Sequence, residues 1–192
     1  MEELKPFAEI LDSDFRATCR GFTLEVLYKL AAAHDLTPAT PANVRHQFEI
    51  ARHAYIYSWL YTPLCGAAEL YAALAVELAL KLRYQASAQA DGRPPPRGLK
   101  DLLKIAVSEG WITDDGFDFE YLELVATSDN VEYREIPLDR RQRPTDIVLE
   151  ALPGIRNSLA HGQPRMTLEK VSGALKRAAE IINQLFRASQ DK

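Results

Sequence analysis

Apolar side chains recur every three to four residues along most of this chain, which is the spacing of an amphipathic helix. The alternation typical of strands is weak by comparison, and stretches rich in proline or glycine separate the periodic segments. The pattern predicts helices over residues 14–33, 42–61, 64–88, 99–109, 145–161 and 167–188.

The first two predicted helices have apolar stripes at helical spacing. Asp14 is a plausible N-cap of the first helix. Its stripe would consist of Phe15, Phe22, Val26 and Leu30. The stripe of the second would consist of Phe48, Ala51, Tyr55, Trp59 and Thr62, and Pro63 should end or kink that helix.

The segment 64–88 is apolar nearly all round and rich in alanine. This composition predicts a central helix that packs closely on several neighbours or across a dimer axis. A linker is expected over 91–98, and Gly110 should stop the short helix that follows it. The segment 113–144 is weakly patterned and is predicted to be a loop insertion.

The predicted helix 145–161 begins at Thr145, a good capping residue, and is expected to be interrupted at Pro153-Gly154 and to end at Gly162 and Pro164. The last helix should bury Val171, Leu175, Ala178, Ile182 and Leu185. We therefore expect an all-α fold, an up-and-down bundle of four to six helices in a single domain over 1–192.

Composition agrees with an ordinary globular protein, with 47% apolar and 26% charged residues. Only Cys19 and Cys65 are present, without a CxxC pair, so neither a disulfide framework nor a zinc site is predicted and a reducing cytoplasm is the expected location. The acidic, proline-broken start does not resemble a signal peptide. No apolar run is long enough to predict a membrane segment.

Charge is unevenly distributed along the chain. The net charge of −4 argues against strong non-specific binding of nucleic acid, yet residues 134–192 carry 11 basic and 7 acidic groups. Arg140, Arg141 and Arg143 lie in this basic third and are candidate phosphate contacts. A solvated basic loop is the alternative interpretation of the same residues.

The segment Arg156-Asn157-Ser158-Leu159-Ala160-His161-Gly162 carries the candidate chemistry. Arginine can grip a phosphate through two parallel hydrogen bonds, and histidine can move a proton near neutral pH. At 100° per residue, Ile155 and Leu159 face the core while Asn157 and His161 lie roughly opposite them. Arg156 lies on the flank. The alternative is that Arg156 and His161 only cap carbonyls at the helix end.

Glu77 and Lys81 stand four residues apart on the central helix, in the favourable order for an ion pair. A plain surface pair is one interpretation. The other places Glu77 in a cleft, where it orients His161 or Arg156, because a buried carboxylate needs a partner. No recognisable metal-ligand set, phosphate-binding loop or hydrolase motif is present, so no metal or cofactor is predicted.

Three segments together resemble the HEPN superfamily. Ile155 to Gly162, with Arg-x4-His and Asn directly after Arg, is similar to the family signature. Leu74 to Arg83 is similar to its long second core helix, and Leu99 to Leu103 through Gly110-Trp111-Ile112 resembles its next element. The resemblance covers about residues 60–188, with 1–60 as an N-terminal helical addition and 113–144 as an insertion.

The resemblance implies a helical homodimer in which two signature helices face one cleft. For active members it implies metal-independent RNA cleavage, with His161 as the acid or base, Arg156 as the phosphate clamp and Asn157 as an orienting residue. Many members act in defence or as toxins with an antitoxin partner, and some only bind a nucleotide or a protein. A non-catalytic binding module and a purely structural motif, with Arg156 buried against Glu77, therefore stand as alternatives.

Overall fold

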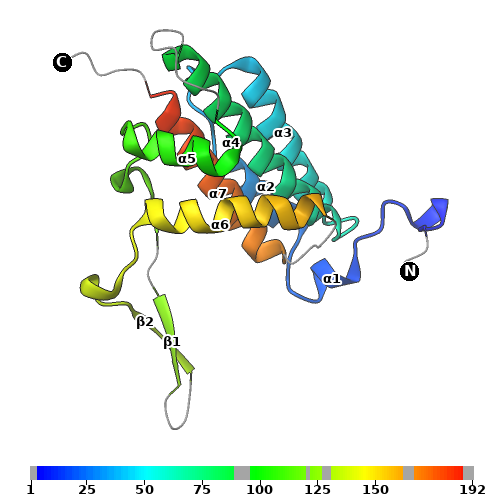
Figure 1. Ribbon diagram of the computed structural model, residues 1–192. Coiled ribbons are helices and arrows are strands. Elements are labelled where there is room, and N and C mark those ends of the chain that lie inside the picture. Colours follow the sequence, from blue (N-terminus) through cyan, green and yellow to red (C-terminus); the bar gives the residue numbers. More distant parts are fainter. Residues whose placement is uncertain (1–3, 89–95, 120–121, 127–130, 162–166, 188–192) are drawn as a thin grey trace.

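The computed structural model describes residues 4–88, 96–119, 122–126, 131–161 and 167–187. Its elements are seven α-helices, one two-stranded hairpin and three short 3₁₀ turns (Figure 1). The helices are α1 (Phe15–Thr18), α2 (Leu24–Ala32), α3 (Ala42–Tyr57), α4 (Leu64–Ala88), α5 (Leu99–Ser108), α6 (Pro144–Ala160) and α7 (Leu168–Leu185). The predicted all-α helical bundle is thus confirmed.

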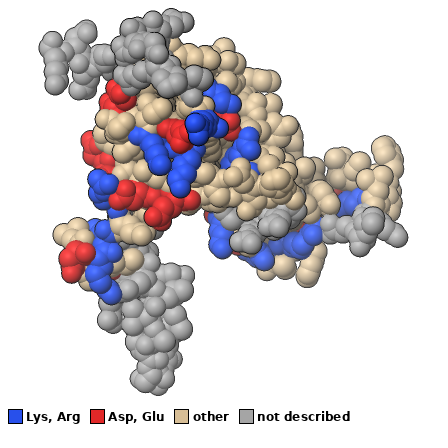
Figure 2. All heavy atoms as spheres, in the orientation of Figure 1, with Lys and Arg blue, Asp and Glu red and all other residues tan. Residues whose placement is uncertain are grey.

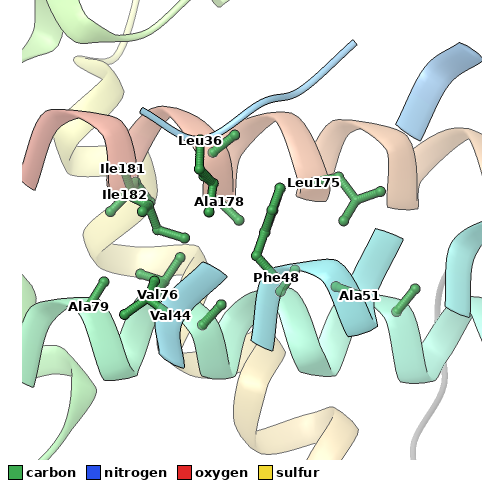
Figure 3. Packing of buried hydrophobic residues seen from close by; sticks show 14 of the residues in the cluster. Leu36, Val44, Phe48, Ala51, Val76, Ala79, Leu175, Ala178, Ile181 and Ile182 are labelled. Carbon is green, nitrogen blue, oxygen red and sulfur yellow. The ribbon is translucent and has the colours of Figure 1, made fainter. Parts of the chain in front are cut away.

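The core of the bundle lies where α3, α4 and α7 pack together. Figure 3 shows side chains from these three helices pointing toward one another, with Phe48 from α3, Val76 and Ala79 from α4, and Leu175 from α7. All four residues are buried. Helix α6 lies across this layer against α4, and α5 lies beside both (Figure 1).

Helix α4 occupies the bounds predicted from its alanine-rich pattern. Its alanines at positions 68, 72, 75 and 79 are buried, and so are Val76 and Leu80. Small side chains let neighbouring helices approach closely, so α4 packs against α3, α5, α6 and α7. The predicted buried positions of α7 are confirmed as well: Val171, Leu175, Ala178, Ile182 and Leu185.

The prediction of one continuous first helix is wrong. Gly21 has a φ of +76°, a left-handed conformation that favours glycine and ends α1. The Thr23 side chain then accepts a hydrogen bond from the Val26 N–H at 3.2 Å and caps α2 as a separate helix. The break changes which positions of the two helices face the core. Ala17, Leu27 and Ala31 are therefore buried, whereas Phe15 is 77% exposed.

Helix α3 ends at Tyr57, earlier than predicted, and the N-terminal segment binds carbonyls of the turn that follows it. The Asp14 N–H donates to the Trp59 carbonyl at 2.8 Å, and Lys5 Nζ donates to the Leu60 carbonyl at 2.9 Å. Asp14 itself is the predicted N-cap of α1 and accepts from the Arg16 N–H. The neighbouring Arg16 guanidinium and the backbone N–H of Thr62 hold the pKa of the Asp14 carboxyl well below its usual range, despite burial.

The loop predicted over 113–144 contains regular structure. Strands β1 (Leu122–Ala126) and β2 (Val131–Glu135) pair antiparallel, and the hairpin projects away from the bundle (Figure 1). A 3₁₀ turn, η2 (Asp114–Gly116), precedes it and packs against α7. The Gln184 side chain accepts a hydrogen bond from the Thr113 N–H at 2.8 Å and fixes that turn to the bundle.

Two predictions about α6 are also wrong. Thr145 is not its N-cap: the helix starts at Pro144, and both the N–H and the hydroxyl of Thr145 donate to Asp114 Oδ1, at 3.0 and 2.7 Å. Asp114 therefore caps α6 from outside the helix. Nor do Pro153 and Gly154 interrupt α6, which runs through them as one helix. The helix stop at Gly162 and Pro164 and most of the 91–98 linker lie outside the described residues.

One phenylalanine from each of the apolar stripes predicted for the first two helices provides a matched test of the core. We expect Phe48→Ala to lower the free energy of unfolding by about 3–5 kcal/mol, because it removes a fully buried ring from the α3–α4–α7 layer. Phe15→Ala should change it by less than about 0.5 kcal/mol, because that ring is exposed. Urea denaturation measures both, and a loss at Phe15 as large as that at Phe48 would contradict this packing.

Candidate functional site

The outward face of α6 carries the candidate chemistry. Asn157 and His161 are exposed, one helical turn apart, as the periodicity predicts. On the opposite side, Val148 is buried and Leu152 and Ile155 are half-buried. The core-facing residues thus fix the rotation of α6 about its axis, and this rotation presents the amide and the imidazole to solvent.

Arg156 is held at the edge of this face by an acid on α4. Its Nε lies 3.2 Å from Glu77 Oε2, and its Nη1 lies 3.5 Å from Asn157 Oδ1. The Arg156 side chain is 33% exposed and that of Glu77 is 12% exposed. A partly buried charge pair of this kind positions a long side chain, so the sequence-based expectation that Glu77 contacts Arg156 is confirmed.

Glu77 also pairs with Lys81. The interpretation as an ion pair with Lys81 and the interpretation in which Glu77 orients Arg156 therefore both apply to this acid. Lys81 Nζ donates to Glu77 Oε1 at 2.7 Å, one turn along α4. Each oxygen of one carboxylate therefore serves a different cation. Figure 2 shows basic and acidic side chains intermixed on this face, over α4 and α5.

A polar cleft opens next to this cluster. It has a volume of about 430 Å³ and lies between α4 and the residues that lead into α5. Its lining consists of Glu77, Lys81, Tyr84, Gln85, Pro96, Arg97, Gly98 and Leu102. The two cations and the volume suit a phosphorylated ligand of nucleotide size. Sequence reasoning did not find Arg97, because no periodic pattern connects it to Lys81.

His161 stands at the C-cap of α6. Its backbone N–H donates to the Asn157 carbonyl at 3.1 Å, and the structure shows no hydrogen bond of its imidazole within the described part of the chain. The Arg156 guanidinium contacts Glu77 and Asn157 rather than a helix-end carbonyl. The interpretation of Arg156 as a carbonyl cap is therefore wrong, and the exposed imidazole has the access that proton transfer to a substrate needs.

The three upstream arginines lie at the other end of α6. Arg143 forms two hydrogen bonds of 2.9 Å with Asp146, and Arg141 donates to the Ile136 carbonyl at 2.8 Å and pairs with Glu135. Arg140 is exposed in the turn before the helix. At 1.5 Å per residue, Arg143 and Arg156 are roughly 20 Å apart along the axis. One protomer therefore does not bring these arginines to the motif.

Glu69 is a buried acid that sequence reasoning did not single out. It lies on α4 and is only 2% exposed, and neither of its carboxylate oxygens has a hydrogen-bond partner within the described residues. Burial raises its pKa to about 7. In the sequence, Glu69 is one acid among the alanines of this helix. That pattern does not show which residues of other helices surround it.

The residues of the described ranges also bear on metal binding and on membrane insertion. No group of three or more His, Cys, Asp or Glu side chains there is arranged to hold a metal ion. No helix in those ranges combines the length and the apolar character that crossing a bilayer requires.

Comparison with known proteins gives no assignment. No family model matches the chain, and no curated protein or solved structure matches it. The similarity to the HEPN signature therefore remains a prediction that rests on the residues themselves and on the site described above.

The double ion pair of Glu77 can be tested against a matched exposed pair. Glu25 and Lys29 have the same spacing and the same distance of 2.7 Å, but both side chains are at least 70% exposed. We expect Glu77→Gln to cost about 1–2 kcal/mol of stability, because it removes the charge that holds Arg156 and Lys81. Glu25→Gln should cost less than about 0.5 kcal/mol. Equal losses in chemical denaturation would show that Glu77 does not fix Arg156.

Proposed function

We propose that this protein is a metal-independent ribonuclease of the HEPN type, active as a homodimer. The observation that carries the proposal is the arrangement on α6: Asn157 and His161 share a solvent-exposed face, and Glu77 fixes Arg156 beside them. His161 would transfer the proton, Arg156 would hold the scissile phosphate, and Asn157 would orient the ribose or the phosphate.

The contacts of Arg156 leave it able to bind phosphate. Glu77 engages Nε, and the 3.5 Å approach to Asn157 Oδ1 is long for a hydrogen bond. A guanidinium has five N–H donors, so the edge formed by Nη1 and Nη2 remains open for two parallel bonds to a phosphate. Glu77 thus orients the clamp without occupying it.

The chemistry favours two copies. Attack by a ribose 2′-hydroxyl requires a base on one side of the phosphate and an acid on the other, whereas one protomer offers one motif imidazole. The exposed face of α6 also carries Gly154, which has no heavy atom within 4 Å of where a Cβ would stand. A glycine at this position lets the backbone of a second α6 come close, and such an approach would bring two His161 side chains to one cleft.

A protein partner such as an antitoxin has a suitable surface. The N-terminal segment exposes the large apolar side chains of Leu4, Phe7, Leu11 and Phe15. Several large apolar side chains exposed within one short segment can form an interaction site. We propose that a protein partner, such as an antitoxin, docks on this segment, which precedes α2.

The second candidate function is a non-catalytic module that binds a nucleotide. The polar cleft between α4 and the start of α5 favours it, because Lys81 and Arg97 line a volume of about 430 Å³. In this candidate Glu77 forms part of the wall of the cleft, Arg156 only pairs with Glu77, and His161 has no chemical role.

Cleavage of single-stranded RNA in the presence of EDTA tests the proposal. We expect the purified chain to cut the RNA, and His161→Ala to lower the rate at least about 10²-fold, because the proton-transfer group is lost. The matched control is His53→Ala. His53 is an exposed histidine that bonds to Glu49 within α3, away from the motif, so its replacement should leave the rate unchanged.

The same preparation separates the two candidates. Sedimentation should show a dimer, and circular dichroism should show that His161→Ala keeps its helical content. Cleavage that EDTA abolishes, or an equal rate for His161→Ala and wild type, contradicts the ribonuclease. Saturable nucleotide binding that Lys81→Ala weakens, with no cleavage by the wild type, selects the binding module.

A further inference from the structure

An apolar cavity of about 210 Å³ lies between α4, α6 and α7. Helix α6 contributes only apolar side chains to it, including Ile147, Leu152 and Ile155. Small residues form much of the remaining wall: Ala72, Ala73, Gly173, Ala174 and Ala178. A cavity of roughly 150 Å³ with apolar walls can hold a molecule of the size of benzene, so this one has room for a single substituted ring.

Glu69 is the acidic residue in the wall of this cavity, which also includes the charged residues Lys170 and Arg177 of α7. It lines the cavity from α4, is buried from solvent, and has no hydrogen-bond partner for either oxygen within the described residues. A buried carboxyl group without a partner is costly, and this cost raises its pKa to about 7. The cavity therefore combines mostly apolar walls with one acidic group that has no hydrogen-bond partner within the described residues.

The charged groups around the cavity leave Glu69 uncompensated. On α7, Arg177 pairs with Glu180 at 2.6 Å and lies 3.7 Å from the centre of the Phe119 ring, and Lys170 is exposed to solvent. On α4, burial raises the pKa of the Cys65 thiol, and on α3 it raises the pKa of Tyr55 to about 12. Desolvation alone accounts for the raised pKa of Glu69, and no cation offsets it.

We propose that this cavity binds a small apolar molecule that carries a protonated primary amine, with the ammonium group on the Glu69 carboxylate and the hydrocarbon ring against α6 and α7. Glu69 has no hydrogen bond to break, so a rotation of its side chain toward the ligand costs only a change of rotamer. Folding has already removed the carboxylate from water, so binding adds only the desolvation of the amine.

This site is separate from the motif. Glu69 lies eight residues before Glu77, roughly 12 Å along α4, and none of Arg156, Asn157 and His161 lines the cavity. Amine binding is measured without RNA. Failure of the ribonuclease proposal and failure of this one are therefore distinguishable.

Calorimetry with cyclohexylmethylamine and its neutral isostere cyclohexylmethanol tests the proposal at pH 8. We expect the wild-type chain to bind the amine at least tenfold more tightly than the alcohol. Glu69→Gln should weaken amine binding at least tenfold and leave alcohol binding unchanged, because the amide keeps the shape and removes the charge. The control Glu25→Gln removes an exposed acid on α2 that does not line the cavity, and this variant should bind the amine like wild type.

The pH dependence provides a second readout that needs no variant. An alkylamine stays protonated well above pH 8, as a lysine side chain does, so Glu69 is the group that titrates. Because its pKa is about 7, amine affinity should fall at least tenfold from pH 8 to pH 5.5.

The stability of the protein without ligand should also depend on pH. The pKa of Glu69 is higher in the folded state than in the unfolded state, so the stability that Glu69 contributes is full below about pH 4.5 and is lost as the pH rises through 7. Glu69→Gln should abolish this loss.

Three outcomes would overturn the proposal. One is equal affinity of the wild type for amine and alcohol, and another is unchanged amine binding by a folded Glu69→Gln variant. The third is the absence of saturable amine binding at pH 8 up to millimolar concentration. If Glu69→Gln does not fold, as judged by circular dichroism, the amine–alcohol comparison and the pH series on the wild type still decide.

Discussion

The close packing of helices around the alanine-rich α4 is the constraint on which the rest of the structure depends. Because half of its buried positions are alanine, α3, α6 and α7 can all pack closely against this one helix. Acids on such a helix necessarily point into interfaces. This is why both Glu69 and Glu77, which would be solvated on an ordinary surface helix, are removed from water.

The two acids differ in what meets them across the interface. Glu77 faces α6 where Arg156 reaches back, and Lys81 completes its coordination. Glu69 faces the part of α6 that offers only aliphatic side chains. Helix α4 thus carries two different carboxylates. That of Glu77 is paired and orients the Arg156 guanidinium, whereas that of Glu69 has no partner within the described residues.

The sequence predicted most reliably what local periodicity controls. The bounds of α4 and the buried face of α7 followed from spacing alone, and the contact between Glu77 and Arg156 followed from the cost of burying a charge on an apolar helix. The errors occurred where distant residues decide local structure. Asp114 caps α6 from another segment, and Asp14 and Lys5 bind the carbonyls of Trp59 and Leu60 in the turn that follows α3. The break before α2 did leave a local signal, a glycine two residues before a capping threonine. The isolation of Glu69 depends on three helices at once, so no single stretch of sequence reveals it.

The continuity of α6 through Pro153 has a mechanical consequence. Proline supplies no N–H, so the carbonyl of Leu149, four residues earlier, has no donor within the helix. The backbone ladder of α6 thus lacks one rung between the half that is anchored in the core and the half that carries Arg156, Asn157 and His161. Bending of α6 at this position therefore costs less than bending of an unbroken helix, and the ion pair between Arg156 and Glu77 is what holds the terminal half against α4.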